Sequence, residues 1–120
     1  MSKVVLYLSI DEVNCYVAKR LAKQAGLDVQ LITSARSLAG LLKNMNGEVR
    51  GVIVEVNRSF LTENVDELCD VVLQAAARGK TCVVHGLGIP AAKKAQLKTL
   101  GIRSRRFLDR TCFLECDRRS

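Results

Sequence analysis

The sequence VVLYLSIDE, residues 4–12, joins five consecutive apolar side chains to the polar start of a helix. An apolar run of this length is typical of a strand that is buried on both faces of a parallel sheet. Ser9 and Glu12 have the spacing of a capping box, in which a hydroxyl and a carboxylate bind free amides of the first helical turn. Apolar positions then recur at helical intervals: Ile10, Val13, Val17 and Leu21. The stretch therefore predicts a strand followed by a helix over about residues 10–25.

The same alternation continues along the rest of the chain. Apolar or β-branched runs predict further strands at residues 29–32, 52–56 and 81–84, and a last strand around residues 106–108. Helical spacing of apolar side chains predicts helices in the intervening segments. Their signals are a cap at Ser34, the run of apolar positions from Val65 to Ala76, and Pro90 at a first turn, with glycines ending them at positions 47, 79 and 101.

Strands that alternate with helices form βαβ units, whose right-handed crossovers build a parallel sheet with helices on both faces. We therefore predict an α/β fold, a doubly wound five-stranded parallel sheet, in a single domain over residues 1–120. Only ten residues follow Arg110, so the last helix is expected to be short or missing. In such sheets a site forms at the carboxyl ends of the strands. The residues predicted there are Ser9, Ile10, Asp11, Glu55, Asn57, His85 and Gly86.

The composition excludes several classes of function. The chain has five aromatic residues and no Trp, which argues against proteins that stack single-stranded bases on aromatic side chains. It has no apolar run near the roughly 20 residues that cross a bilayer and no cleavable signal pattern, so we expect a cytoplasmic protein without membrane contact. Five cysteines without a CxxC spacing predict reduced core thiols. No hydrolase or metal motif is present, so no enzyme activity, cofactor or metal is expected.

Positive charge is concentrated near the carboxyl end. Residues 1–92 hold 10 Lys and Arg against 9 Asp and Glu, whereas residues 93–120 hold 9 against 3. This part of the chain could face an acidic protein, a phosphate-bearing ligand or nucleic acid, or could only keep the domain soluble. If the last helix is short, nearby apolar side chains stay thinly covered and mark an interface. The predicted interaction surface is Arg103, Arg105, Arg106, Phe113 and Leu114.

The chain resembles response-regulator receiver domains of two-component signalling over nearly its whole length. The resemblance rests on five βα repeats, on AGLDV at residues 25–29, and on SARSL at residues 34–38. It implies a flavodoxin-like winding and a phosphorylation site at the strand ends. In receivers, paired acids hold Mg²⁺, an Asp after the third strand attacks phosphorus, and a Ser or Thr and a Lys complete the site.

This sequence departs from that pattern at every position. The residues found there are Ser9 and Ile10 for the paired acids, Glu55 for the Asp, His85 for the Ser or Thr, and Arg110 for the Lys. Asp11 comes one position too late to be one of the pair. Without the acids, little remains to coordinate a hard cation or to offset phosphate charge. We therefore predict a degenerate receiver. Glu55 either holds a permanent negative charge paired with Arg110 or another base, or caps the next turn or reaches solvent, and His85 is expected to be a turn residue at a strand end.

The leading hypothesis is thus a phosphorylation-independent signalling module that binds a protein partner, a second copy of the chain included. An alternative is a small-anion or nucleotide site formed by Gly86, Gly88 and the amides of the helix after Pro90. A third hypothesis is weak, salt-sensitive nucleic-acid binding through the arginines at 103, 105 and 106.

Overall fold

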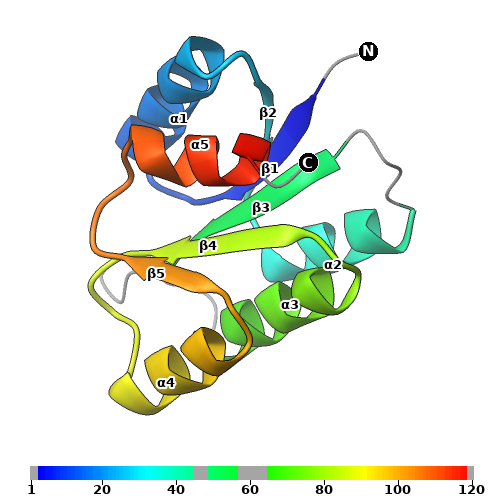
Figure 1. Cartoon of the computed structure of the whole chain (residues 1–120), viewed down its shortest axis with the longest axis vertical. Coiled ribbons are helices and arrows are strands. Elements are labelled where there is room, and N and C mark those ends of the chain that lie inside the picture. Colours follow the sequence, from blue (N-terminus) through cyan, green and yellow to red (C-terminus); the bar gives the residue numbers. More distant parts are fainter. Residues whose placement is uncertain (1–2, 45–48, 57–64, 119–120) are drawn as a thin grey trace.

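The computed structural model describes residues 3–44, 49–56 and 65–118, in which strands and helices alternate (Figure 1). The elements in chain order are β1 (Val4–Leu8), α1 (Glu12–Gln24), β2 (Asp28–Ile32), α2 (Ala35–Lys43), β3 (Val49–Glu55), α3 (Val65–Ala77), β4 (Thr81–His85), α4 (Ala91–Thr99), β5 (Arg103–Arg105) and α5 (Arg110–Arg118).

The five strands form one parallel sheet in the order β2-β1-β3-β4-β5, which confirms the predicted doubly wound α/β fold. The winding direction changes between β1 and β3, where Leu8 is in register with Val54. Next in register, Glu55 stands beside His85 on β4. The residues that follow β1, β3 and β4 are therefore brought to one point at the carboxyl edge of the sheet.

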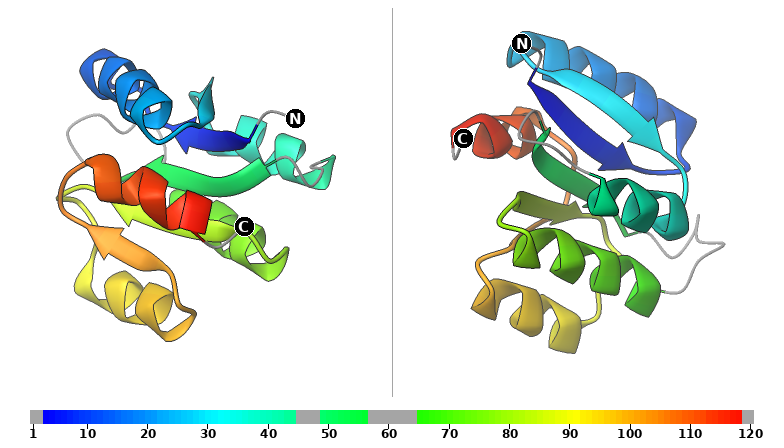
Figure 2. Two further views of the ribbon diagram at one scale, coloured as in Figure 1. Left: turned by 45° about the horizontal axis from the view of Figure 1, so that its top comes forward. Right: turned by 90° about the vertical axis from the view of Figure 1, so that its right-hand side faces the viewer.

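Helices cover both faces of the sheet. α1 and α5 lie on one face, and α2, α3 and α4 lie on the other (Figures 1 and 2). Alternate strand residues point to opposite faces, so each strand contributes to two apolar clusters. Leu6 and Val52 join the cluster under α2, α3 and α4, whereas Val5, Tyr7 and Ile53 join the cluster under α1 and α5.

The last helix is present and has nine residues. Helical spacing places Cys112, Phe113 and Cys116 together, and all three are fully buried against the sheet. A close approach of α5 to β3 is possible because residue 51 is a glycine, where a Cβ atom would collide with the side chain of Cys116. The prediction that Phe113 lies in an exposed interface was therefore wrong, and Leu114 is only half-buried.

The start of α1 differs from its prediction. Asp11, not Ser9, is the N-cap, and its carboxylate accepts from the amides of Val13 at 2.9 Å and Asn14 at 3.4 Å. Val13 is 69% exposed, so it does not belong to the buried side of the helix. The small side chains of Ala18 and Ala22 form that side instead and let α1 pack close to the sheet.

β5 also lies earlier than predicted, at Arg103–Arg105 instead of residues 106–108. Ile102 is buried and directs the chain into the sheet directly before the strand. Phe107, which the sequence placed in a strand, follows β5 and is 66% exposed. The edge strand of the sheet is therefore short and carries two arginines.

All five cysteines are free, and four of them are buried, as predicted for reduced core thiols. In the described part of the chain, no helix has the length and apolar character needed to cross a membrane.

Candidate functional site

A buried carboxylate occupies the point where the winding direction changes. Glu55 ends β3 and is only 7% exposed. Its Oε1 accepts a hydrogen bond from the Ser9 hydroxyl, and its Oε2 accepts one from the Asn14 side-chain amide at 2.7 Å. We refer to Glu55, Ser9 and Asn14 as the carboxylate network. Each oxygen of the Glu55 carboxylate therefore has a donor inside the molecule.

Backbone contacts fix the donors of this network. The backbone N–H of Ser9 donates to the carbonyl of Ile32 on β2 at 3.1 Å, which continues the sheet one residue beyond β1. The Ser9 hydroxyl also accepts from the amide of Asp11 at 3.0 Å, so its own proton is left for Glu55. Asn14 lies in the first turn of α1, which the Asp11 cap holds in place. The fold itself therefore positions both donors.

A second buried polar pair lies beside the network. The Tyr7 hydroxyl and His85 Nε2 are 2.8 Å apart, and their rings are stacked with centroids 5.7 Å apart. Burial lowers the pKa of His85 to about 4, and burial together with the charge of Glu55 raises the pKa of Tyr7. Both side chains are therefore neutral near pH 7. His85 lies at the strand end, as predicted, but it is the last residue of β4 and is 2% exposed, so it belongs to the buried strand and not to the turn.

A cavity of about 230 Å³ opens next to Glu55. Its walls come from the ends of β3 and β4, the start of α1 and the loops after β1, β4 and β5: Asp11, Asn14, Glu55, His85, Gly86, Leu87, Arg106, Phe107 and Leu108. Among the described residues, the cation that lines it is Arg106, which the sequence placed on the interaction surface. Arg110 begins α5 and is exposed, and within the described residues no ion pair joins it to Glu55. The predicted pairing of Glu55 with Arg110 was therefore wrong, since β5 ends five residues earlier than Arg110.

The remaining predicted residues divide between the site and its surroundings. Asp11 lines the cavity but is occupied as the cap of α1. Ile10 is 41% exposed and lines a neighbouring groove between α1 and β2. Asn57 lies outside the described residues. Sequence reasoning missed Asn14, although a polar residue three positions after the cap of α1 is a signal that could have indicated it.

The two glycines of the loop after β4 do not supply free amides to the predicted anion site. The Gly86 amide donates to the carbonyl of Arg105 at 3.0 Å, and the Gly88 amide donates to the carbonyl of Val56 at 3.3 Å. Gly86 has a φ of +132°, and a Cβ atom there would collide with the Val56 carbonyl. Because both amides already have acceptors in the fold, neither is left to bind a phosphate or a nucleotide.

The donor set at this edge does not fit Mg²⁺, the ion that receiver domains use. Mg²⁺ requires oxygen ligands in near-ideal octahedral geometry, and proteins usually supply one or two carboxylates that point at the ion. Here both Glu55 oxygens accept hydrogen bonds, and Ile10 offers no oxygen from its side chain. In residues 3–44, 49–56 and 65–118, no group of three His, Cys, Asp or Glu side chains could hold a metal ion.

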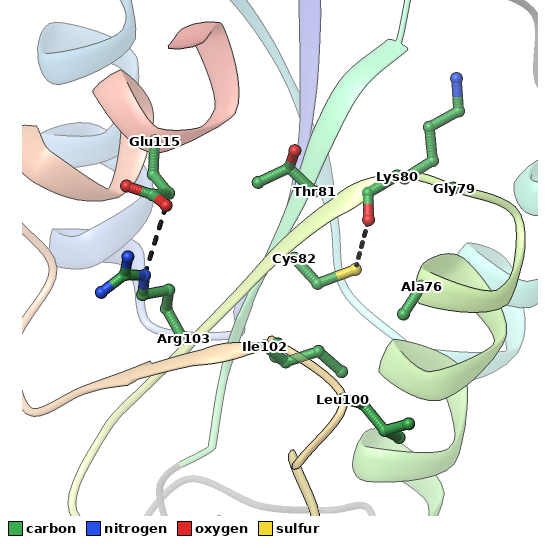
Figure 3. A pocket seen from close by; sticks show the side chains of 10 residues that line it. Ala76, Gly79, Lys80, Thr81, Cys82, Leu100, Ile102, Arg103 and Glu115 are labelled. Carbon is green, nitrogen blue, oxygen red and sulfur yellow. Dashed lines mark hydrogen bonds and ion pairs between the residues drawn. The ribbon is translucent and has the colours of Figure 1, made fainter. Parts of the chain in front are cut away.

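A separate cavity of about 250 Å³ lies at the opposite, amino edge of the sheet (Figure 3). Thr81 and Arg103, the first residues of β4 and β5, line it together with residues from the ends of α3 and α4. Figure 3 shows the Arg103 guanidinium reaching the carboxylate of Glu115 on α5, at 3.3 Å. This cavity shares no residue with the carboxylate network.

Comparisons with solved structures find the receiver fold. No protein-family model and no curated protein sequence matches the chain. A response regulator receiver protein from Sinorhizobium medicae aligns with a TM-score of 0.74 over 99% of this chain and 98% of its own, at 13% identity. One from Pseudomonas putida aligns with a TM-score of 0.73 over 100% and 98%, at 16% identity.

A de novo designed Rossmann 2x3 protein also aligns, with a TM-score of 0.63 over 98% of this chain and 85% of its own, at 19% identity. A designed protein shares the winding without sharing a natural history. At such identities the likeness establishes the fold, and function has to be argued from the site. The chain therefore has the five-stranded fold of receiver domains.

Proposed function

We propose that this chain is a phosphorylation-independent, receiver-like signalling module of the cytoplasm that acts by binding a protein. The observation that carries the proposal is the carboxylate network. Glu55 takes the position of the phosphoaccepting Asp, and its carboxylate accepts hydrogen bonds from Ser9 and Asn14. Nucleophilic attack on phosphorus requires a free carboxylate oxygen and a metal that neutralises the phosphoryl group.

The groups around Glu55 support a structural role over a catalytic one. His85 is neutral near pH 7 and bound to Tyr7, so it does not offset phosphate charge. In the described part of the chain, Arg106 is the cation that lines the cavity, and it contacts the ring of Phe107. With its acids and its metal ligands replaced, the domain can transmit information only through the shape and the charge of its surface.

Incubation with acetyl phosphate and Mg²⁺, followed by intact-mass measurement, tests the proposal. We expect no mass increase, while a phosphorylatable receiver domain gains one phosphoryl group under the same conditions. Glu55→Gln is the matched variant, because Gln keeps the size of the side chain and cannot form an acyl phosphate. A Mg²⁺-dependent phosphoryl adduct on the wild type that is absent from Glu55→Gln would contradict the proposal.

A further inference from the structure

The segment from the β4–α4 loop to the end of β5 is uniformly basic. Residues 86–108 contain six Lys and Arg and no Asp or Glu. Three of these cations have an acid nearby from another part of the fold. Lys93 pairs with Asp66 at 3.3 Å, Arg103 pairs with Glu115 at 3.3 Å (Figure 3), and Arg105 interacts electrostatically with Asp109.

Lys94 and Lys98 have no such acid among the residues that the structure describes. Both are exposed on α4, and within the described residues neither forms an ion pair. They stand four positions apart, so they lie on one side of the helix, where like charges destabilise it. The first turn of α4 holds no acid to complement the helix dipole, and its cap, Pro90, offers no side-chain hydrogen bond. The free domain therefore keeps an unfavourable charge pair on a poorly capped helix.

The two lysines border a groove along the edge of the sheet. This groove has a volume of about 330 Å³ and is lined by Lys94, Ala95, Lys98, Ile102, Arg103 and Ser104. Ala95 and the buried Ile102 contribute apolar carbon to it. β5 pairs with β4 on one side only, so its outer side presents backbone groups of an edge strand. We call Lys94, Lys98, Arg103 and the outer side of β5 the basic edge.

We propose that the basic edge binds an extended acidic segment of a partner protein, laid alongside β5. This inference rests on the proposed function and names the chemistry of its partner. Carboxylates of the segment would neutralise Lys94 and Lys98, and its backbone would pair with the open edge of β5. Apolar side chains between the acids would cover Ala95 and Ile102. A protein segment fits better than nucleic acid, because none of the described residues that line the groove has an aromatic side chain to stack on bases.

A labelled peptide of alternating Glu and Val is the direct probe, with the Lys–Val peptide as the charge control. Fluorescence anisotropy should show saturable binding of the Glu–Val peptide that weakens as salt rises, and no binding of the Lys–Val peptide. The double variant Lys94→Glu, Lys98→Glu should lose affinity by at least about tenfold, since two attractive contacts become repulsive. Thermal unfolding of each variant confirms that it is folded.

The matched control is the double variant Lys23→Glu, Arg36→Glu, which makes the same change in net charge on α1 and α2, away from β5. We expect it to change the affinity by less than about threefold. Equal losses in the two double variants would overturn the proposal, because binding would then follow net charge alone. Absence of binding to the wild type would also overturn it. Duplex DNA is the last comparison. If DNA binds the wild type more tightly than the peptide does, and the double variant Lys94→Glu, Lys98→Glu loses this DNA binding, the proposal is also overturned.

These outcomes are separate from those of the phosphorylation test. Peptide binding with no phosphoryl adduct supports both proposals. An adduct with intact peptide binding contradicts the proposed function only, and loss of peptide binding without an adduct contradicts only the inference about the basic edge.

Discussion

The carboxylate network and the basic edge differ in whether their charged side chains have partners within the fold. At the network, each oxygen of Glu55 has a donor, and the donors Ser9 and Asn14 are themselves fixed by the fold. At the basic edge, Lys94 and Lys98 repel each other and, in the described part of the chain, have no acidic partner.

This difference indicates which region stabilises the fold and which region is available to bind a partner. A buried charge costs free energy unless it is hydrogen-bonded, so the network must be complete for the domain to be stable. An exposed like-charge pair costs little and can be neutralised by a partner. Substitutions at the network should therefore destabilise the domain, whereas replacing Lys94 or Lys98 with an acid should stabilise the free domain.

The largest effect is expected at Gly86, beside the network. Gly86→Ala should lower the free energy of unfolding by at least about 3 kcal/mol, because its φ is +132° and the new Cβ meets the Val56 carbonyl. Urea denaturation measures this loss. Gly40→Ala is the control: position 40 lies in α2 with open space around it, so alanine should add about 1 kcal/mol. Equal stability of Gly86→Ala and the wild type would contradict the packing described for this loop.

Lowering the pH should destabilise the domain, because His85 beside the network becomes protonated. Its pKa is about 4 in the folded domain and about 6.5 in the unfolded chain, so the unfolded chain binds more protons between these values. The contribution of neutral His85 to the free energy of unfolding is therefore fully present above pH 6.5. As the pH falls towards 4, the free energy of unfolding should decrease by up to about 3 kcal/mol.

Urea denaturation at several pH values, on the wild type and on His85→Gln, measures this contribution. Gln cannot titrate, so the variant should be less stable at pH 7 and should lose less stability between pH 6.5 and 4. Parallel pH profiles of the two proteins would show that His85 is not buried in its neutral form.

Removal of one donor from the network should have an intermediate effect. Ser9→Ala leaves Glu55 Oε1 without its donor and the Asp11 amide without its acceptor, at a cost of about 2 kcal/mol. Ser37→Ala, an exposed serine on α2, should change stability by less than about 0.5 kcal/mol. Equal urea midpoints for Ser9→Ala and Ser37→Ala would contradict the role given to the Ser9 hydroxyl in the network.

The smallest effect has the opposite sign. Lys94→Glu should raise the free energy of unfolding by about 0.5 kcal/mol, since the new carboxylate would pair with Lys98 and complement the start of α4. Lys23→Glu is the control, because an acid in the last turn of α1 opposes the helix dipole and should lower stability by a similar amount. A destabilised Lys94→Glu would mean that Lys94 already has a favourable contact in the free domain.

The fold was predictable because its signal is repeated along the chain. Five apolar runs alternate with helical spacing, and parallel strands joined by crossover helices have few arrangements. The placement of Ser9, Glu55 and His85 at one edge followed from the same rule, since the carboxyl ends of parallel strands meet there. In the structure, Ser9 donates to Glu55, and Glu55 is in register with His85.

The contacts within the site could not be predicted in the same way. Asn14 reaches Glu55 only because α1 begins at Glu12, and a capping signal two residues earlier in the sequence concealed that start. Arg106 replaces Arg110 at the cavity because β5 ends earlier than its sequence pattern indicates. Both outcomes depend on shifts of a few residues at element ends, where local sequence signals are weakest.

Titration of the isotopically labelled protein with Mg²⁺, followed in its amide NMR spectrum, tests the central claim most directly. If Ser9 and Asn14 occupy the Glu55 carboxylate, the Asn14 side-chain amide and the backbone amide of Asp11 keep their positions throughout the titration. Saturable shifts of these two signals, present in the wild type and absent from Glu55→Gln, would show that Glu55 binds the ion and would contradict the account.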